Sequence, residues 1–140
     1  MNQWELSDAD KADLADLPEA VQPFFHSDPH SRAQPAMRCG YYRIANDLGR
    51  EIVVGDRGVF AIDATGELPD CFVNSSVADL AEFLRETGAF QAGVAGMDED
   101  EAVAKVLEIR ERLQRRDPAA FADDGTWWSM VFDQLESGQY

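Results

Sequence analysis

Carboxylates are the most abundant groups in this sequence that could do chemistry. The chain has 27 Asp and Glu residues among its 140, and two neighbouring carboxylates can act as a general acid and a general base. At this density, neighbouring acids arise by chance along the whole chain. Pairing alone therefore identifies no catalytic residues.

The histidines and cysteines are the next candidates for metal binding or catalysis. His26 and His30 are four residues apart, a spacing that places two metal ligands on one face of a helix. Pro29 lies between them and disfavours helical backbone at the preceding residue, so we expect a solvated loop there. Cys39 and Cys71 lack CxxC spacing, and we expect both to be reduced thiols in the core.

Longer catalytic motifs are absent. The sequence contains no GxSxG, P-loop, GxGxxG, HExxH or EF-hand spacing. Trp127 and Trp128 could form a binding platform, although one Trp in the core with the other covering its edge is the commoner arrangement. We therefore expect no catalytic residues, no metal and no cofactor.

The net charge limits the partners. With 12 Lys and Arg residues against 27 acids, the formal charge is −15, which disfavours nucleic acid and anionic membranes as partners. The same charge suits a basic protein partner or simply keeps the chain soluble. No apolar run approaches the ~18 residues of a membrane span, and residues 1–6 lack the features of a signal peptide, so we expect a cytoplasmic protein.

Along the chain, helices are expected before and after a sheet. Ser7 is placed to cap a first helix that reaches Leu14, and Pro18 suits the first turn of a second helix over 19–25. Ser76 and Asp79 can form a capping box that starts a helix after the sheet, and Gly88 is expected to end it. Four strands are predicted at 41–45, 51–54, 59–63 and 70–73, because these short apolar runs are separated by turns.

A long amphipathic helix is predicted over 99–116. Its acids gather at the start and its arginines at the end, which complements the helix dipole, and Pro118 ends it. Thr126 is placed to cap a final helix. The apolar stripe of the long helix contains Val103, Val106, Leu107, Ile109 and Leu113.

The order of these segments resembles the SUKH superfamily of bacterial immunity proteins, in particular its fourth family. The resemblance covers residues 17–138, and its most specific stretch, 72–84, runs from a strand through Asn74, Ser75 and Ser76 into a helix. It ends with Trp127 and Trp128 and a glycine near the C-terminus. We expect the Asn-Ser-Ser side chains to accept from the free helix N–H groups, and the two Trp residues to close the core.

The resemblance implies a single α+β domain over residues 1–140, with an antiparallel meander of about four to five short strands packed with helices at the N-terminus and after the sheet. It also implies a protein without catalytic activity that binds and neutralises a toxin encoded nearby, often a nuclease or a nucleic-acid deaminase. We expect a monomer, with a homodimer as the alternative. A regulatory or scaffold protein of the same fold, unrelated to toxins, remains the second hypothesis, and a small enzyme or ligand-binding domain the third.

The interface is expected among acids in loops and at helix starts. For the densest run, the alternative is that it only complements the helix dipole. The candidates form three clusters, namely Asp98, Glu99, Asp100 and Glu101, then Asp63, Glu67 and Asp70, and finally Asp123 and Asp124.

Overall fold

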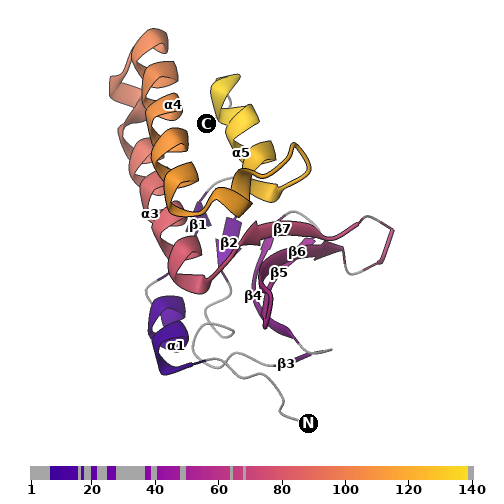
Figure 1. The fold of residues 1–140 in the computed structure, drawn as a ribbon. Coiled ribbons are helices and arrows are strands. Elements are labelled where there is room, and N and C mark those ends of the chain that lie inside the picture. The colour runs from indigo at the N-terminus through magenta and orange to yellow at the C-terminus, as the bar shows by residue number, and fades with distance from the viewer. Residues whose placement is uncertain are drawn as a thin grey trace.

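The computed structural model describes residues 7–15, 17, 20–21, 25–27, 37–38, 41–47, 50–63, 65–67 and 69–138. The chain begins with a short helix, continues through an antiparallel sheet and ends with helices that lie against the sheet (Figure 1). This is the expected α+β architecture.

The first helix, α1, spans Asp8–Ala15. Ser7 caps it as predicted, because its Oγ accepts a hydrogen bond from the backbone N–H of Asp10 at 3.0 Å. Leu14 is fully buried, and α1 packs against α3, which spans Val77–Gly93.

The helix predicted over 19–25 is wrong. Strands β1, Ala20–Val21, and β2, Phe25–Ser27, lie there instead and pair antiparallel. β2 also pairs with β4, so the sheet supplies the backbone hydrogen bonds that a helix would otherwise form. A short apolar run does not by itself distinguish a strand from a helix. His26 therefore lies in a strand rather than a loop, whereas His30 and Cys39 lie outside the described residues.

The central meander is confirmed. Each of its four strands pairs antiparallel with the next along the chain. The meander itself has four strands, within the four to five expected. β3, Met37–Arg38, pairs with β4, and with β1 and β2 the described residues form a seven-stranded sheet. The meander consists of β4 Tyr41–Asp47, β5 Arg50–Gly55, β6 Gly58–Asp63 and β7 Cys71–Asn74.

The two faces of the meander differ in what covers them. Residues directly opposite one another on paired strands share a face. Ile52 and Ala61 are such a pair, and both belong to the hydrophobic core. Val53 is opposite Phe60, which is opposite Phe72, so these three lie on the other face. None of the three belongs to the core cluster, but Val53 is buried, with an exposed fraction of 2%, whereas Phe60 and Phe72 are partly exposed.

Gly58 brings two parts of the sheet close together. Its φ is +120°, a conformation that L side chains rarely adopt, and a Cβ there would lie 2.5 Å from the carbonyl oxygen of Asn74. Glycine is therefore required at the start of β6.

The helix after the sheet is longer than predicted. α3 continues through Gly88 to Gly93, because Thr87 and Phe90 bury their side chains on either side of that glycine. Packing outweighs the ~1 kcal/mol that an interior glycine costs a helix. A short 3₁₀ turn, η1, follows over Val94–Gly96.

The remaining helices return to the sheet. α4 spans Glu99–Arg116, as predicted, and Asp117 follows it as the C-cap. The 3₁₀ helix η2 covers Pro118–Phe121, and α5 covers Trp127–Glu136. α3 rises away from the sheet, α4 returns beside α3, and α5 packs against α4 and β7 (Figure 1). Leu107, expected on the buried stripe of α4, is 51% exposed.

Candidate functional site

Asp117 joins the end of α4 to the end of the sheet. This carboxylate is buried, with an exposed fraction of 3%. Its Oδ2 accepts hydrogen bonds from Asn74 Nδ2 at 3.0 Å and from the backbone N–H of Ser75 at 2.9 Å. Its Oδ1 accepts from Ser75 Oγ at 2.7 Å. We call these three residues, with Trp128, the buried junction.

The two tryptophans anchor α5 to the sheet. Trp128 Nε1 donates to Asn74 Oδ1 at 2.8 Å, and Trp127 Nε1 donates to Asp47 Oδ2 at 2.8 Å. Both side chains are buried, so the arrangement in which one Trp covers the edge of the core is wrong. The prediction that the pair closes the core from the final helix is confirmed.

The Asn-Ser-Ser stretch works differently from the prediction. Ser76 is the N-cap of α3, and its Oγ accepts from the backbone N–H of Asp79 at 3.1 Å, as predicted. Asn74 and Ser75 instead donate to Asp117. Sequence reasoning missed Asp117 because nothing in the local pattern connects it to residues more than forty positions earlier. The buried junction is a structural network.

The acids at the start of α4 form what we call the helical tip, Asp98–Glu101. It lies at the end of the helices far from the sheet (Figure 1). Asp98 is the N-cap, and its Oδ1 accepts from the backbone N–H of Glu101 at 2.8 Å. All four side chains are exposed. Beside the tip is a shallow cleft of about 380 Å³, lined by Val94, Met97, Asp98, Glu99, Ala102, Ser137 and Gly138.

The other two acidic clusters each contain one acid that shapes a turn. Asp63 Oδ1 accepts from the backbone N–H of Thr65 at 3.0 Å and from its Oγ1 at 2.8 Å. Asp123 Oδ1 accepts from the N–H of Gly125 at 2.8 Å. The structure places the three clusters on three separate segments. The acids left exposed without such a bond are Glu67, Asp70 and Asp124.

Most acids on the flanks of the helices are paired with arginines. Arg110 contacts Asp133 at 3.4 Å and Glu136 at 2.9 Å. Arg112 bridges Glu86 and Glu108, and the hydrogen bond that it donates to Glu86 raises the pKa of its guanidinium above the ordinary value. These flanks are therefore largely neutralised within the chain, unlike the tip.

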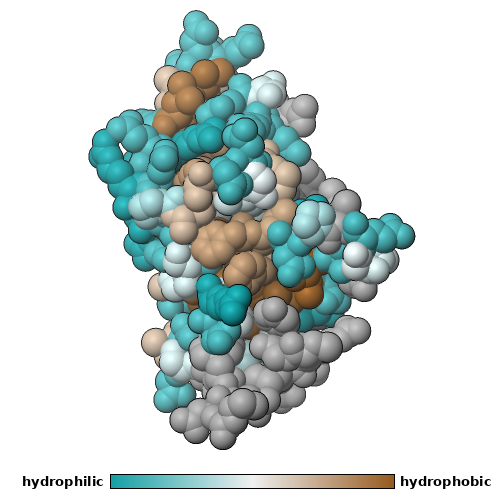
Figure 2. Space-filling model, turned by 45° about the vertical axis from the view of Figure 1, so that its right-hand side comes forward, coloured by the Kyte–Doolittle hydropathy of each residue, from teal (hydrophilic) through white to brown (hydrophobic). Residues whose placement is uncertain are grey.

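The open sheet face, which we define as the partly exposed Phe60, Ile62 and Phe72, is apolar, and Val53 on the same side of the sheet is buried. Phe60 and Phe72 are partly exposed, and their rings pack edge to face with centroids 5.5 Å apart. Glu51 is opposite Ile62 in the strand register, so it lies on this face as well. Figure 2 turns this side of the molecule forward and shows an apolar area bordered by hydrophilic atoms.

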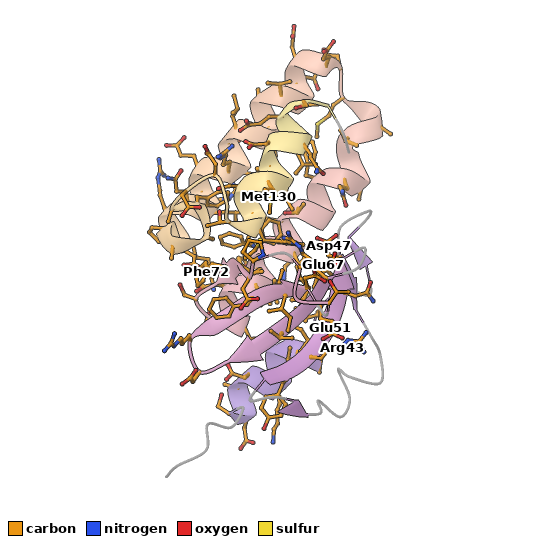
Figure 3. The ribbon with its side chains drawn as sticks, turned by 90° about the vertical axis from the view of Figure 1, so that its right-hand side faces the viewer. Arg43, Asp47, Glu51, Glu67, Phe72 and Met130 are labelled. Atoms are coloured by element: carbon orange, nitrogen blue, oxygen red, sulfur yellow. The ribbon has the colours of Figure 1, made fainter. Side chains whose placement is uncertain are left out.

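Acidic side chains lie around the open sheet face. Figure 3 shows Glu51 beside Arg43 on the sheet, with Asp47 and Glu67 toward α5. The Arg43 Nε atom is 3.6 Å from Glu51 Oε1. Sequence reasoning identified Glu67 but missed this face. Its signal was present, because residues 59–62 and 71–73 are apolar at consecutive positions, which places apolar side chains on both faces of a strand.

The described residues offer no constellation for metal chemistry, since no three His, Cys, Asp or Glu side chains among them are grouped to hold an ion. Cys71 is buried as expected, and Arg50 Nη1 lies 2.7 Å from its sulfur. None of the helices in the described ranges is both long and apolar enough to cross a membrane.

Comparison with known proteins identifies a family match. The family model described as SUKH-4 immunity protein matches residues 8–134. No curated protein and no solved structure matches the chain.

Proposed function

The chain belongs to the SUKH-4 immunity protein family, and we propose that it binds and neutralises a toxin domain encoded beside its own gene without catalysing a reaction. The observation that carries this proposal is the family match, which extends over nearly the whole chain. Because fold alone does not determine function, the chemistry of the surface has to be consistent with it.

The distribution of polar groups supports a binding role. The buried polar side chains of the junction are held by one another, and Asp117 uses both of its carboxylate oxygens for this purpose. The acids that have no structural task lie on the surface. Such an arrangement provides charge for the recognition of a partner.

We propose a basic toxin domain that acts on nucleic acid, either a nuclease or a deaminase. Enzymes that hold nucleic acid need a positively charged groove, and a chain with a formal charge of −15 is complementary to such a groove. Opposite charge also accelerates association, to about 10⁸–10⁹ M⁻¹s⁻¹ at low salt. Binding in the cytoplasm would protect the nucleic acid of the producing cell.

Co-expression tests the proposal. Each toxin domain encoded beside the gene is induced in cells with and without this chain, and growth and nucleic-acid damage are measured. We expect the chain to restore growth and to copurify with one toxin domain in a stable complex. If no neighbouring toxin domain is bound or neutralised, the proposal fails, and the regulatory or scaffold role becomes the better hypothesis.

A further inference from the structure

The open sheet face is where partly exposed aromatic side chains lie outside the core. The rings of Phe60 and Phe72 pack edge to face with their centroids 5.5 Å apart, and neither residue belongs to the core cluster. Elsewhere in the described part of the chain, the one strongly exposed large hydrophobic side chain is Leu107 on α4. Grouped apolar surface of this kind marks interaction sites more often than scattered single residues do.

The charge around this face indicates the chemistry of its partner. Glu67 and Asp70, in the segment between β6 and β7, are exposed, and neither forms an ion pair with any described residue. Glu51 also lies on this face, but Arg43, which lies opposite Val53 on the same face, is 3.6 Å from it and offsets its charge. An apolar centre with a charged rim is the usual anatomy of a protein interface. Here the rim charges that no described cation offsets are those of Glu67 and Asp70, so this part of the rim fits Lys and Arg side chains on the partner.

We propose that the open sheet face is the surface on which the basic toxin domain docks. The inference rests on the proposed function and adds the location of the interface. Phe60 and Phe72 form the desolvated centre, where aromatic residues contribute most to affinity. Glu67 and Asp70 meet cationic side chains of the toxin at the rim and accelerate its association.

A second copy of this chain does not fit the same face. Two copies would bring formal charges of −15 together, and each would place its acidic rim against that of the other. Like charges facing each other at an interface are strongly unfavourable. The charge therefore selects a basic partner.

Matched charge reversals test the location. One variant carries Glu67→Lys and Asp70→Lys, and the control carries Glu99→Lys and Asp100→Lys at the helical tip. Each pair changes the charge by +4, from −15 to −11. Any effect of overall charge is therefore the same in both. Binding of the copurified toxin domain is measured by surface plasmon resonance at low and moderate salt, and thermal unfolding shows that each variant is folded.

We expect the Glu67/Asp70 variant to weaken binding at least about tenfold, mainly through slower association, and the difference in association rate should shrink as salt is added. The tip variant should change the affinity less than about threefold. A second pair removes apolar contacts. Phe72→Ser should weaken binding at least about thirtyfold, whereas Leu107→Ser should not. If Phe72→Ser does not fold, the charge reversals decide.

The outcomes separate the two proposals. If the unchanged chain binds no neighbouring toxin domain, both proposals fail. Suppose instead that the chain binds and neutralises a toxin domain. If both charge variants then weaken binding equally, or if only the tip variant weakens it, the proposed docking surface is overturned and the proposed function stands. If sedimentation shows a dimer that Phe72→Ser dissociates, a second copy occupies the face, which also overturns the docking surface.

Discussion

The buried junction and the helical tip both depend on aspartate, but they use it in opposite ways. Asp117 is 3% exposed and accepts hydrogen bonds from Asn74 Nδ2 and from the N–H and Oγ of Ser75. Asp98 is exposed and accepts one, at the start of α4. The environment of a carboxylate, and not its position in an acidic run, therefore decides whether it holds the fold or remains available to a partner.

The largest expected effect in this comparison is at the junction. Asp117→Ala removes the acceptor of one buried donor, Asn74 Nδ2, and of two partly buried donors on Ser75. An unsatisfied buried donor costs about 1–3 kcal/mol. We expect a loss of about 3 kcal/mol in the free energy of unfolding, measured by urea denaturation with tryptophan fluorescence. Asp117→Asn keeps the shape and one acceptor oxygen, and we expect it to lose about half as much. An unchanged midpoint for Asp117→Ala would remove the distinction between the two regions.

The strand that supports the junction should show the next effect. Gly58→Ala places a Cβ 2.5 Å from the carbonyl oxygen of Asn74 and forces alanine to adopt φ near +120°. We expect a loss of about 2 kcal/mol in the free energy of unfolding. Gly66→Ala is the matched control, because its φ is also positive, at +75°, but no atom lies within 4 Å of the new Cβ. It should lose about 1 kcal/mol. Equal losses would mean that the close approach to Asn74 relaxes.

The helical tip should show a smaller effect. Asp98→Ala removes the N-cap bond to the N–H of Glu101, and loss of such a cap costs about 1 kcal/mol. Asp100→Ala, in the same turn but not the cap, loses only its interaction with the helix dipole, which is worth about 0.3–1 kcal/mol. Both changes are measured by thermal unfolding. A cap variant that destabilises as much as Asp117→Ala would contradict the comparison.

Local signals predicted the parts of the fold that depend on local chemistry. The Ser76 cap with Asp79, the end of α4 before Pro118 and the four meander strands are all determined within a few residues. The helix expected over 19–25 became two strands, because pairing of β2 with β4 lies outside the local window. The end of α3 also depends on distant contacts. The helix continues past Gly88 because the side chain of Phe90, two residues later, is buried in the core.

The candidate site was less predictable than the fold. Three acidic clusters could be named from the sequence, but their separation on the molecule could not, because it depends on how α4 is placed relative to the sheet. Asp117 was missed because its partners lie more than forty residues earlier in the chain. The open sheet face was missed because a run of apolar residues does not say which face of a strand remains uncovered.

The smallest expected effect concerns the paired flank of the helices. Arg112 lies between Glu86 and Glu108, but its side chain is 47% exposed and those of the two acids are 25% and 59% exposed. Water and salt screen such pairs, so Arg112→Ala should lose at most about 0.5 kcal/mol in the free energy of unfolding, and the loss should shrink at high salt. Urea denaturation at low and at high salt measures both quantities, with Arg115→Ala, which removes a more exposed pair with Glu111, as the control. A loss comparable to that of Asp117→Ala would mean that surface ion pairs hold the helices together. Since stability would then rest on the same exposed charges that a partner has to contact, recognition and folding would no longer be separate tasks of different carboxylates.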